Sequence, residues 1–85
     1  MMRRRLLRQI VRVGRQCEPA DPQQAADWYE EALRVDPSAE DVYRSLMNVH
    51  HRLGRSTEVE KVYRRCQTAL AGHLATLLRE RGERP

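Results

Sequence analysis

An internal repeat constrains the fold of this chain more than any other feature of its sequence. A pattern centred on Tyr29 returns 34 residues later around Tyr63. Its positions are Ala25, Tyr29 and Ala32 in the first copy and Val59, Tyr63 and Cys66 in the second. Repeats of about 34 residues consist of two helices joined by a turn. The sequence therefore predicts an all-α chain of stacked helix pairs, with Tyr29 and Tyr63 buried in equivalent positions.

The segment around Tyr29 has the pattern of an amphipathic helix that ends at Asp36-Pro37. Its apolar residues share one helical face, and they are Ala25, Trp28, Tyr29, Ala32 and Leu33. The residue before a proline is disfavoured in the α region, which ends the helix there. Because Ala25 and Ala32 are small, a second helix can approach closely on either side of Tyr29.

The same periodicity predicts about four helices, the last of them long, in a single small domain. These are one over residues 3–17, one around Tyr29, one between Ser38 and Gly54, and one over about 56–80. Asp21, with Pro22 at the first helical position, and Ser38 are the expected caps of the second and third helices. The domain of residues 1–85 thus divides into a first helix pair, 3–36, and a second, 38–81.

Several of these residues carry a family resemblance. Ala25, Tyr29, Ala32 and Pro37 resemble the second half of a tetratricopeptide unit, which implies a right-handed array of antiparallel helix hairpins. Trp28 to Leu70 resembles the bacterial transcriptional activator domain, a tetratricopeptide-like domain of antibiotic-regulatory-type and related bacterial regulators. The matching features are the Asp36-Pro37 turn, Arg44 with Leu46 and Met47, the segment Leu53-Gly54-Arg55, and the helix with Val59 and Tyr63.

The resemblance implies a part of a larger transcriptional regulator, without that regulator's DNA-binding domain. We expect the domain to act through protein–protein contacts, including dimerisation, and not by reading bases. Val59 and Cys66 stand where the tetratricopeptide pattern usually has alanine. A free-standing tetratricopeptide-like adaptor unrelated to transcription is the alternative.

The charges are distributed unevenly along the chain. Residues 1–17 carry six arginines and no acid, residues 18–41 eight acids and one arginine, and residues 42–85 nine bases and four acids. Most of these charges are expected on solvated helix faces. The asymmetry also suggests a charged partner, and the Arg-rich first helix leaves weak, sequence-independent nucleic-acid binding as an alternative. Sequence-specific DNA reading is not expected, because no recognition helix stands out.

No constellation of catalytic, metal-binding or cofactor-binding residues occurs. Cys17 and Cys66 fall on apolar helix faces and lack metal-ligand spacing. His50 and His73 likewise lie on apolar stripes. We therefore expect a non-enzyme with no metal and no cofactor. Without a signal peptide or a long apolar run, we expect a cytoplasmic protein with no membrane segment.

The tetratricopeptide resemblance also implies a concave groove lined by the first helix of each pair. The residues expected there are Arg8, Arg12, Arg15, Arg44, Asn48 and Arg52. Arg44 and Asn48 are one turn apart and resemble the carboxylate-binding pairs of peptide-binding tetratricopeptide domains. The expected ligand is an acidic segment of a partner protein or of the parent chain. Alternatively, Arg44 forms an internal salt bridge to the acidic second helix.

The fourth helix carries more apolar surface than a two-hairpin core can cover. The leucines left over are Leu70, Leu74, Leu77 and Leu78. Burying such a side chain stabilises by about 1.5–3 kcal/mol, and repeat arrays usually need three units or caps. We therefore expect self-association through these leucines. The alternative is a closed monomer whose tail folds back.

Overall fold

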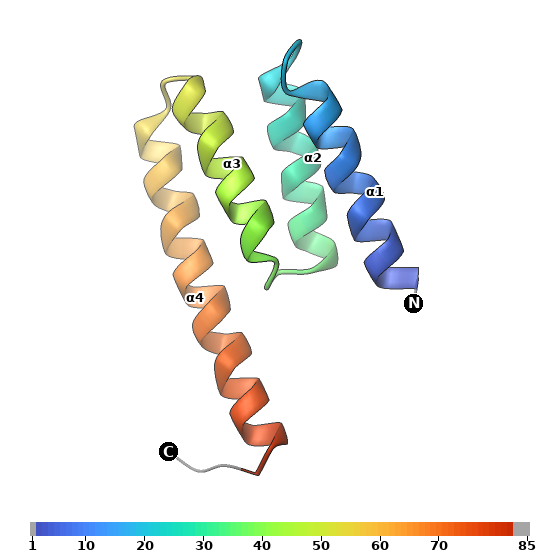
Figure 1. The fold of residues 1–85 in the computed structure, drawn as a ribbon. Helices are drawn as coiled ribbons and strands as arrows, with labels where there is room; N and C mark the ends of the chain where they lie inside the picture. The colour runs from blue at the N-terminus through green and yellow to red at the C-terminus, as the bar shows by residue number, and fades with distance from the viewer. Residues whose placement is uncertain (1, 83–85) are drawn as a thin grey trace.

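The computed structural model describes residues 2–82, which form four α-helices running alternately up and down (Figure 1). They are α1 (Met2–Cys17), α2 (Pro22–Val35), α3 (Glu40–Arg52) and α4 (Ser56–Glu80). This part of the chain contains no strand. The prediction of an all-α fold with four helices and a long last one is confirmed.

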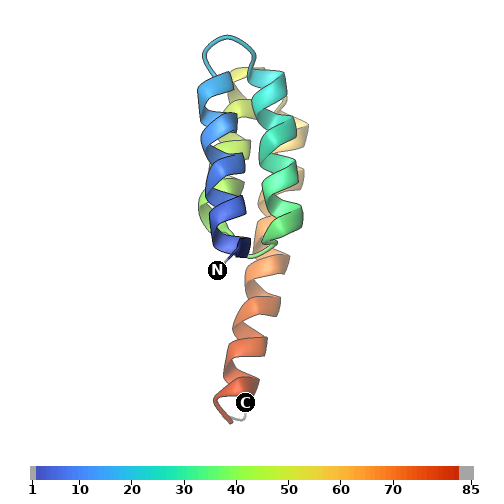
Figure 2. The ribbon, with the colours of Figure 1, turned by 90° about the vertical axis from the view of Figure 1, so that its right-hand side faces the viewer.

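The helices are arranged as two antiparallel pairs stacked side by side. Each helix packs on the next along the chain, so that α2 contacts both α1 and α3. In the side view, α1 and α3 form one layer and α2 and α4 the other (Figure 2). The C-terminal half of α4 extends beyond the other three helices in both views. This arrangement is that of a tetratricopeptide-like array.

The start of α2 follows the predicted capping chemistry. The Asp21 carboxylate accepts a hydrogen bond from the backbone N–H of Gln24 at 3.1 Å, and Pro22 occupies the first helical position, where no N–H is required. At the same end of the array (Figure 1), Gly54 has a φ of 73°, which suits glycine after the end of α3. Both of these predictions are confirmed.

Ser38 does not cap α3, so that prediction is wrong. The helix begins at Glu40 after Ala39, whose side chain makes no capping hydrogen bond. The Ser38 hydroxyl instead donates to the Asp36 carboxylate at 2.7 Å, and the Ser38 N–H donates to the same oxygen at 3.0 Å. This local turn before the helix satisfies Ser38 and removes it from the cap position.

Tyr29 lies at the centre of the core. Its side chain is fully buried, and its ring lies so close to Gly14 that a Cβ there would be 2.7 Å from Cε1. Residues from all four helices form the same cluster: Ile10, Ala25, Ala26, Tyr29, Ala32, Leu33, Val42, Tyr43, Leu46, Val49, Val62 and Cys66. The absence of a side chain at Gly14 therefore lets α1 pack on the Tyr29 ring.

Tyr63 is not buried, although the repeat predicted a position equivalent to that of Tyr29. Its side chain is 53% exposed. Tyr29 is on α2, which has a helix of the next pair, α3, packed against it. Within the described residues no helix follows α4 to cover Tyr63 in the same way. The repeat thus holds for the backbone and fails for the burial of this ring.

Glu18, in the turn between α1 and α2, joins the two pairs at one end of the array. It accepts a hydrogen bond from the Tyr29 hydroxyl and another from Arg52, at the end of α3, at 3.1 Å. Burial raises the pKa of the Tyr29 hydroxyl well above its usual value, and the bond to Glu18 raises it further. Since α1 packs mainly on α2, this bridge helps to fix the position of α3 relative to α1.

An ion pair links α2 to α4, the two helices of the other layer. Arg65 donates two hydrogen bonds to the Glu30 carboxylate, at 2.8 and 2.9 Å. These bonds hold the pKa of the Glu30 carboxyl below its usual value. A carboxylate of the acidic second helix is therefore paired with an arginine of α4.

The contact between Gly14 and Tyr29 can be isolated by comparing two glycine-to-alanine substitutions. Both Gly14→Ala and Gly72→Ala gain helix propensity, worth roughly 1 kcal/mol, but a Cβ at Gly72 meets nothing within 4 Å. Overpacking against the buried ring should cost about 1–3 kcal/mol. We expect Gly72→Ala to unfold in more urea than the wild type and Gly14→Ala to be less stable than Gly72→Ala by that amount. Equal stabilisation by both would show that the contact is not tight.

The Glu18 bridge is tested by Glu18→Ala, with Glu60→Ala as its matched control. Loss of Glu18 leaves the Tyr29 hydroxyl and Arg52 without this acceptor, which should cost about 1–3 kcal/mol of unfolding free energy. Glu60 forms an exposed pair with Arg64 on α4, and its loss should change stability by no more than about 0.5 kcal/mol. Urea denaturation of both variants gives the comparison, and similar small losses would mean that the bridge does not hold the pairs together.

Candidate protein-binding groove

A groove lies between α1 and α3. These two helices form one layer of the array (Figure 2). Its volume is about 640 Å³. Leu7 and Val11 from α1 and the buried Val42 from α3 contribute its apolar surface. The full lining is Leu7, Arg8, Val11, Arg12, Arg15, Gln16, Ala39, Glu40, Asp41 and Val42. The groove exists because α1 and α3 are held apart by α2, which packs against both.

Arginines form the α1 wall of this groove. Arg8, Arg12 and Arg15 follow each other at steps of four and three residues, which places them on one face of the helix. All three are exposed. Among the described residues, none of them has a carboxylate within ion-pair distance. The wall therefore presents three guanidinium groups free to bind carboxylates or phosphates.

The facing wall is acidic. Glu40 and Asp41, in the first turn of α3, line the groove opposite the arginines. Glu40 is engaged by Arg44 of the same helix at 3.1 Å. The groove is thus basic along α1 and acidic where α3 begins, with apolar side chains between.

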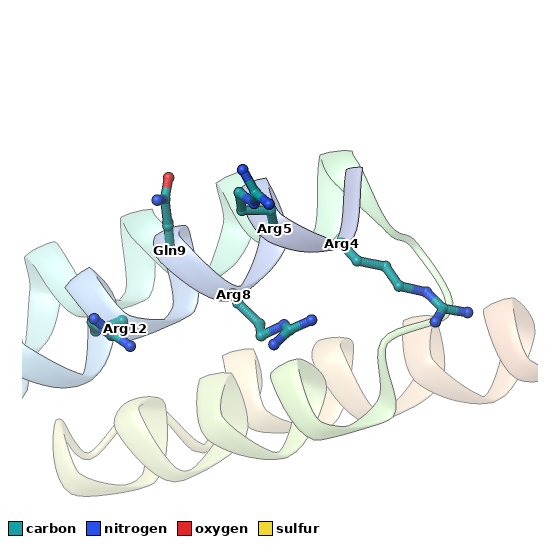
Figure 3. A pocket seen from close by; sticks show the side chains of 5 residues that line it. All are labelled: Arg4, Arg5, Arg8, Gln9 and Arg12. Atoms are coloured by element: carbon teal, nitrogen blue, oxygen red, sulfur yellow. The ribbon is translucent and has the colours of Figure 1, made fainter. Parts of the chain in front are cut away.

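A second hollow, of about 460 Å³, lies on the exposed face of α1 (Figure 3). It is lined by Arg4, Arg5, Arg8, Gln9 and Arg12, with no acidic residue. Arg5 and Gln9 point away from α3, whereas Arg4 extends towards the turn between α2 and α3. Arg8 and Arg12 line both hollows, so the arginine surface is continuous from the groove to the outside of α1.

Only half of the residues expected in the groove line it. Arg8, Arg12 and Arg15 do. Arg44 pairs with Glu40 within α3, and Arg52 pairs with Glu18. The remaining residue, Asn48, is exposed and lines neither hollow. The internal partner of Arg44 is on its own helix and not on the acidic α2.

Sequence reasoning missed the apolar floor and the acidic wall. Leu7 and Val11 are one turn apart and adjacent to Arg8 and Arg12, a signal of a mixed surface that was available in the sequence. Whether Val42 faces a groove or the core cannot be read from its spacing, since it does both.

The leucines expected to mediate self-association lie along the later part of α4. Leu70 is partly buried against the core. Leu74, Leu77 and Leu78 are exposed, at 57%, 41% and 38%. Since α4 remains one helix to Glu80, the structure does not show the alternative of a tail that folds back over them.

The described residues offer little for metal or redox chemistry. No group of three His, Cys, Asp or Glu residues among them could hold a metal ion. Both cysteines are free, and burial raises the pKa of the Cys66 thiol. Within the same range, no helix is both long and apolar enough to cross a membrane.

Comparison with known proteins identifies the family. A family model described as the bacterial transcriptional activator domain matches residues 2–81, nearly the whole chain. No curated protein and no solved structure matches the chain. The match covers all four helices and both walls of the groove. The chain therefore belongs to the bacterial transcriptional activator domain family, and it is a helical domain of the kind found in transcriptional regulators.

Proposed function

We propose that this domain is a protein-interaction module of a bacterial transcriptional regulator and that it binds a protein segment in the groove between α1 and α3. The observation that carries the proposal is the combination of an apolar floor with three arginines along one wall that form no ion pair within the described part of the chain. The segment would belong to a partner protein or to the parent regulator, in the cytoplasm where transcription takes place.

The groove chemistry defines the segment that would fit it. Apolar side chains would pack on Leu7, Val11 and Val42. Carboxylates beside them would pair with Arg8, Arg12 and Arg15, which succeed each other at about 4.5–6 Å along the helix axis. An amphipathic helix with an acidic edge meets both requirements.

The acidic start of α3 gives the segment an orientation. Glu40 and Asp41 would repel a carboxylate that approached their side of the groove. The acidic edge of the segment must therefore face α1, while basic or neutral residues face α3. Such opposed walls favour one binding direction over its reverse.

The groove proposal is tested with a synthetic amphipathic peptide of about four helical turns, apolar on one face and rich in glutamate beside it. We expect Arg15→Glu to weaken its binding about tenfold or more, equivalent to about 1.4 kcal/mol, because Arg15 lines only the groove. Fluorescence anisotropy at about 50 and 200 mM salt should also show weaker binding at the higher salt.

Arg5→Glu is the matched control for the groove experiment. Arg5 is on the same helix and lines only the outer hollow, so peptide affinity should change little. A peptide with lysine in place of glutamate should bind less well than the glutamate peptide. Equal binding of both peptides, or equal loss with Arg5→Glu and Arg15→Glu, would exclude specific recognition in the groove.

A second candidate function is weak contact with a nucleic-acid backbone. It is favoured by the outer hollow, where four arginines gather without an acidic residue. Phosphate contacts of this kind carry no base specificity and weaken steeply with salt.

This candidate makes the opposite prediction for the same two variants. Binding to a random-sequence DNA duplex should be weakened by Arg5→Glu and nearly unchanged by Arg15→Glu. Removal of one phosphate contact should also lower the slope of log affinity against log salt by about 1. Duplex binding that is absent in the wild type at about 50 mM salt would eliminate the candidate.

A further inference from the structure

One side of α4 carries a regular stripe whose members are exposed except for Leu70, which is partly buried against the core. Its members succeed each other at steps of four, three, four and three residues, and they are Tyr63, Gln67, Leu70, Leu74 and Leu77. This is the spacing of the contact positions of a coiled coil, in which one helix packs along another. The buried side of α4, with Val62 and Cys66, faces α3 and is a different surface.

The stripe contains three of the five large hydrophobic residues that are exposed in the described chain: Tyr63, Leu74 and Leu77. The other two are Leu78, also on α4, and Leu6 on α1. Part of the stripe lies on the half of α4 that extends beyond α1, α2 and α3 (Figures 1 and 2). A second helix could therefore reach it without displacing any part of the array.

The α1 side and the α4 side of the array differ in chemistry, and this difference indicates what could cover the stripe. On the α1 side, Arg5 and Gln9 point away from α3 (Figure 3). A head-to-tail stack of copies would place this polar surface against the α4 leucines. The leucines would then have no apolar surface to pack on. A two-fold contact instead brings the same surface of each copy together, so the stripe meets an identical stripe.

We propose that two copies of this domain pair through their α4 helices, which run antiparallel and pack along the stripe. With the two-fold axis between Leu70 and Leu74, Leu70 of each copy faces Leu74 of the other, and Leu77 faces Gln67. The Gln67 amide is held in place by its hydrogen bond to the Tyr63 hydroxyl, at 3.2 Å.

The antiparallel direction follows from the helix dipoles and from the placement of the bodies. Antiparallel helices oppose their dipoles, whereas parallel helices would align them. The three-helix bodies then lie at opposite ends of the pair, each beside the extension of the other copy's α4.

Sedimentation equilibrium over a range of protein concentrations tests the pairing. We expect the wild type to approach twice the chain mass of 10.0 kDa and Leu74→Glu to remain at the monomer mass. Leu77→Glu should do the same and provides a second, independent disruption if one variant loses helix content by circular dichroism. A wild type that stays monomeric throughout, or folded Leu74→Glu and Leu77→Glu variants that still pair, would overturn the proposal.

Three control variants distinguish disruption of the stripe from the effect of an added charge and from a role of the groove. Ala75→Glu, the next residue but away from the stripe, and Leu6→Glu, the same substitution on α1, should leave the dimer intact. Arg15→Glu should also leave it intact. A monomer produced by Arg15→Glu, with Leu74→Glu still dimeric, would mean that α4 of one copy enters the groove of another and would overturn the α4 pairing.

The direction is tested by disulfide trapping in a background with Cys17→Ser and Cys66→Ala. Leu70→Cys and Leu74→Cys are made as separate proteins of different tagged mass and mixed before oxidation. We expect the mixed product to exceed both like-with-like products, because the antiparallel register places position 70 beside position 74. An excess of the two like-with-like products would establish parallel helices and overturn the antiparallel arrangement.

Discussion

The burial of the Tyr29 ring is the interaction on which the rest of the structure depends. The ring is fully buried against Gly14 of α1, and its hydroxyl reaches Glu18, which in turn holds Arg52 of α3. One residue of α2 thereby connects the first helix, the first turn and the third helix. Because a protein interior is packed to near-crystalline density, the separation of these elements is set by the size of that ring and varies little.

The groove is a consequence of this packing. Since α2 holds α1 and α3 apart, the edges of their apolar stripes, at Leu7 and Val42, remain partly uncovered by each other. The arginines of α1 add charge to an apolar surface that the fold creates in any case. Binding of a segment in the groove, as proposed, would therefore need no conformational change in the array, and its cost in ordering would fall mainly on the bound segment.

The sequence predicted the helices well because their signals are local. The spacing around Tyr29, the Asp21 cap and Gly54 each act within one or two turns, and each appears in the structure as expected. The failures concern relations between distant residues. Alignment of the buried positions of α1 and α3, with Ile10 opposite Leu46, places Gly14 opposite the buried His50. The space beside Gly14 that accepts the Tyr29 ring therefore has no counterpart in the second pair for Tyr63.

The site was less predictable for a similar reason. Helical periodicity places Arg8, Arg12 and Arg44 on exposed faces, but it does not say which acid lies within reach of each. Glu40, one turn before Arg44, pairs with it, and Glu18, brought near by the fold, pairs with Arg52. Neither arginine is part of the lining of the groove. Ion-pair partners 34 residues apart depend on the packing of whole helices, which a periodic pattern does not specify.

The extension of α4 is the part of the fold that the core explains least. The helix has 25 residues, whereas its partner α3 has 13. From Leu74 to Glu80 every residue is exposed, and helical segments without tertiary packing are marginal in water. Gly72 and Thr76 lower the intrinsic propensity of this stretch further. The leucines of this stretch have coiled-coil spacing, so a second helix along the exposed side would stabilise it best. The same contact that covers the leucines would then also keep the extension helical.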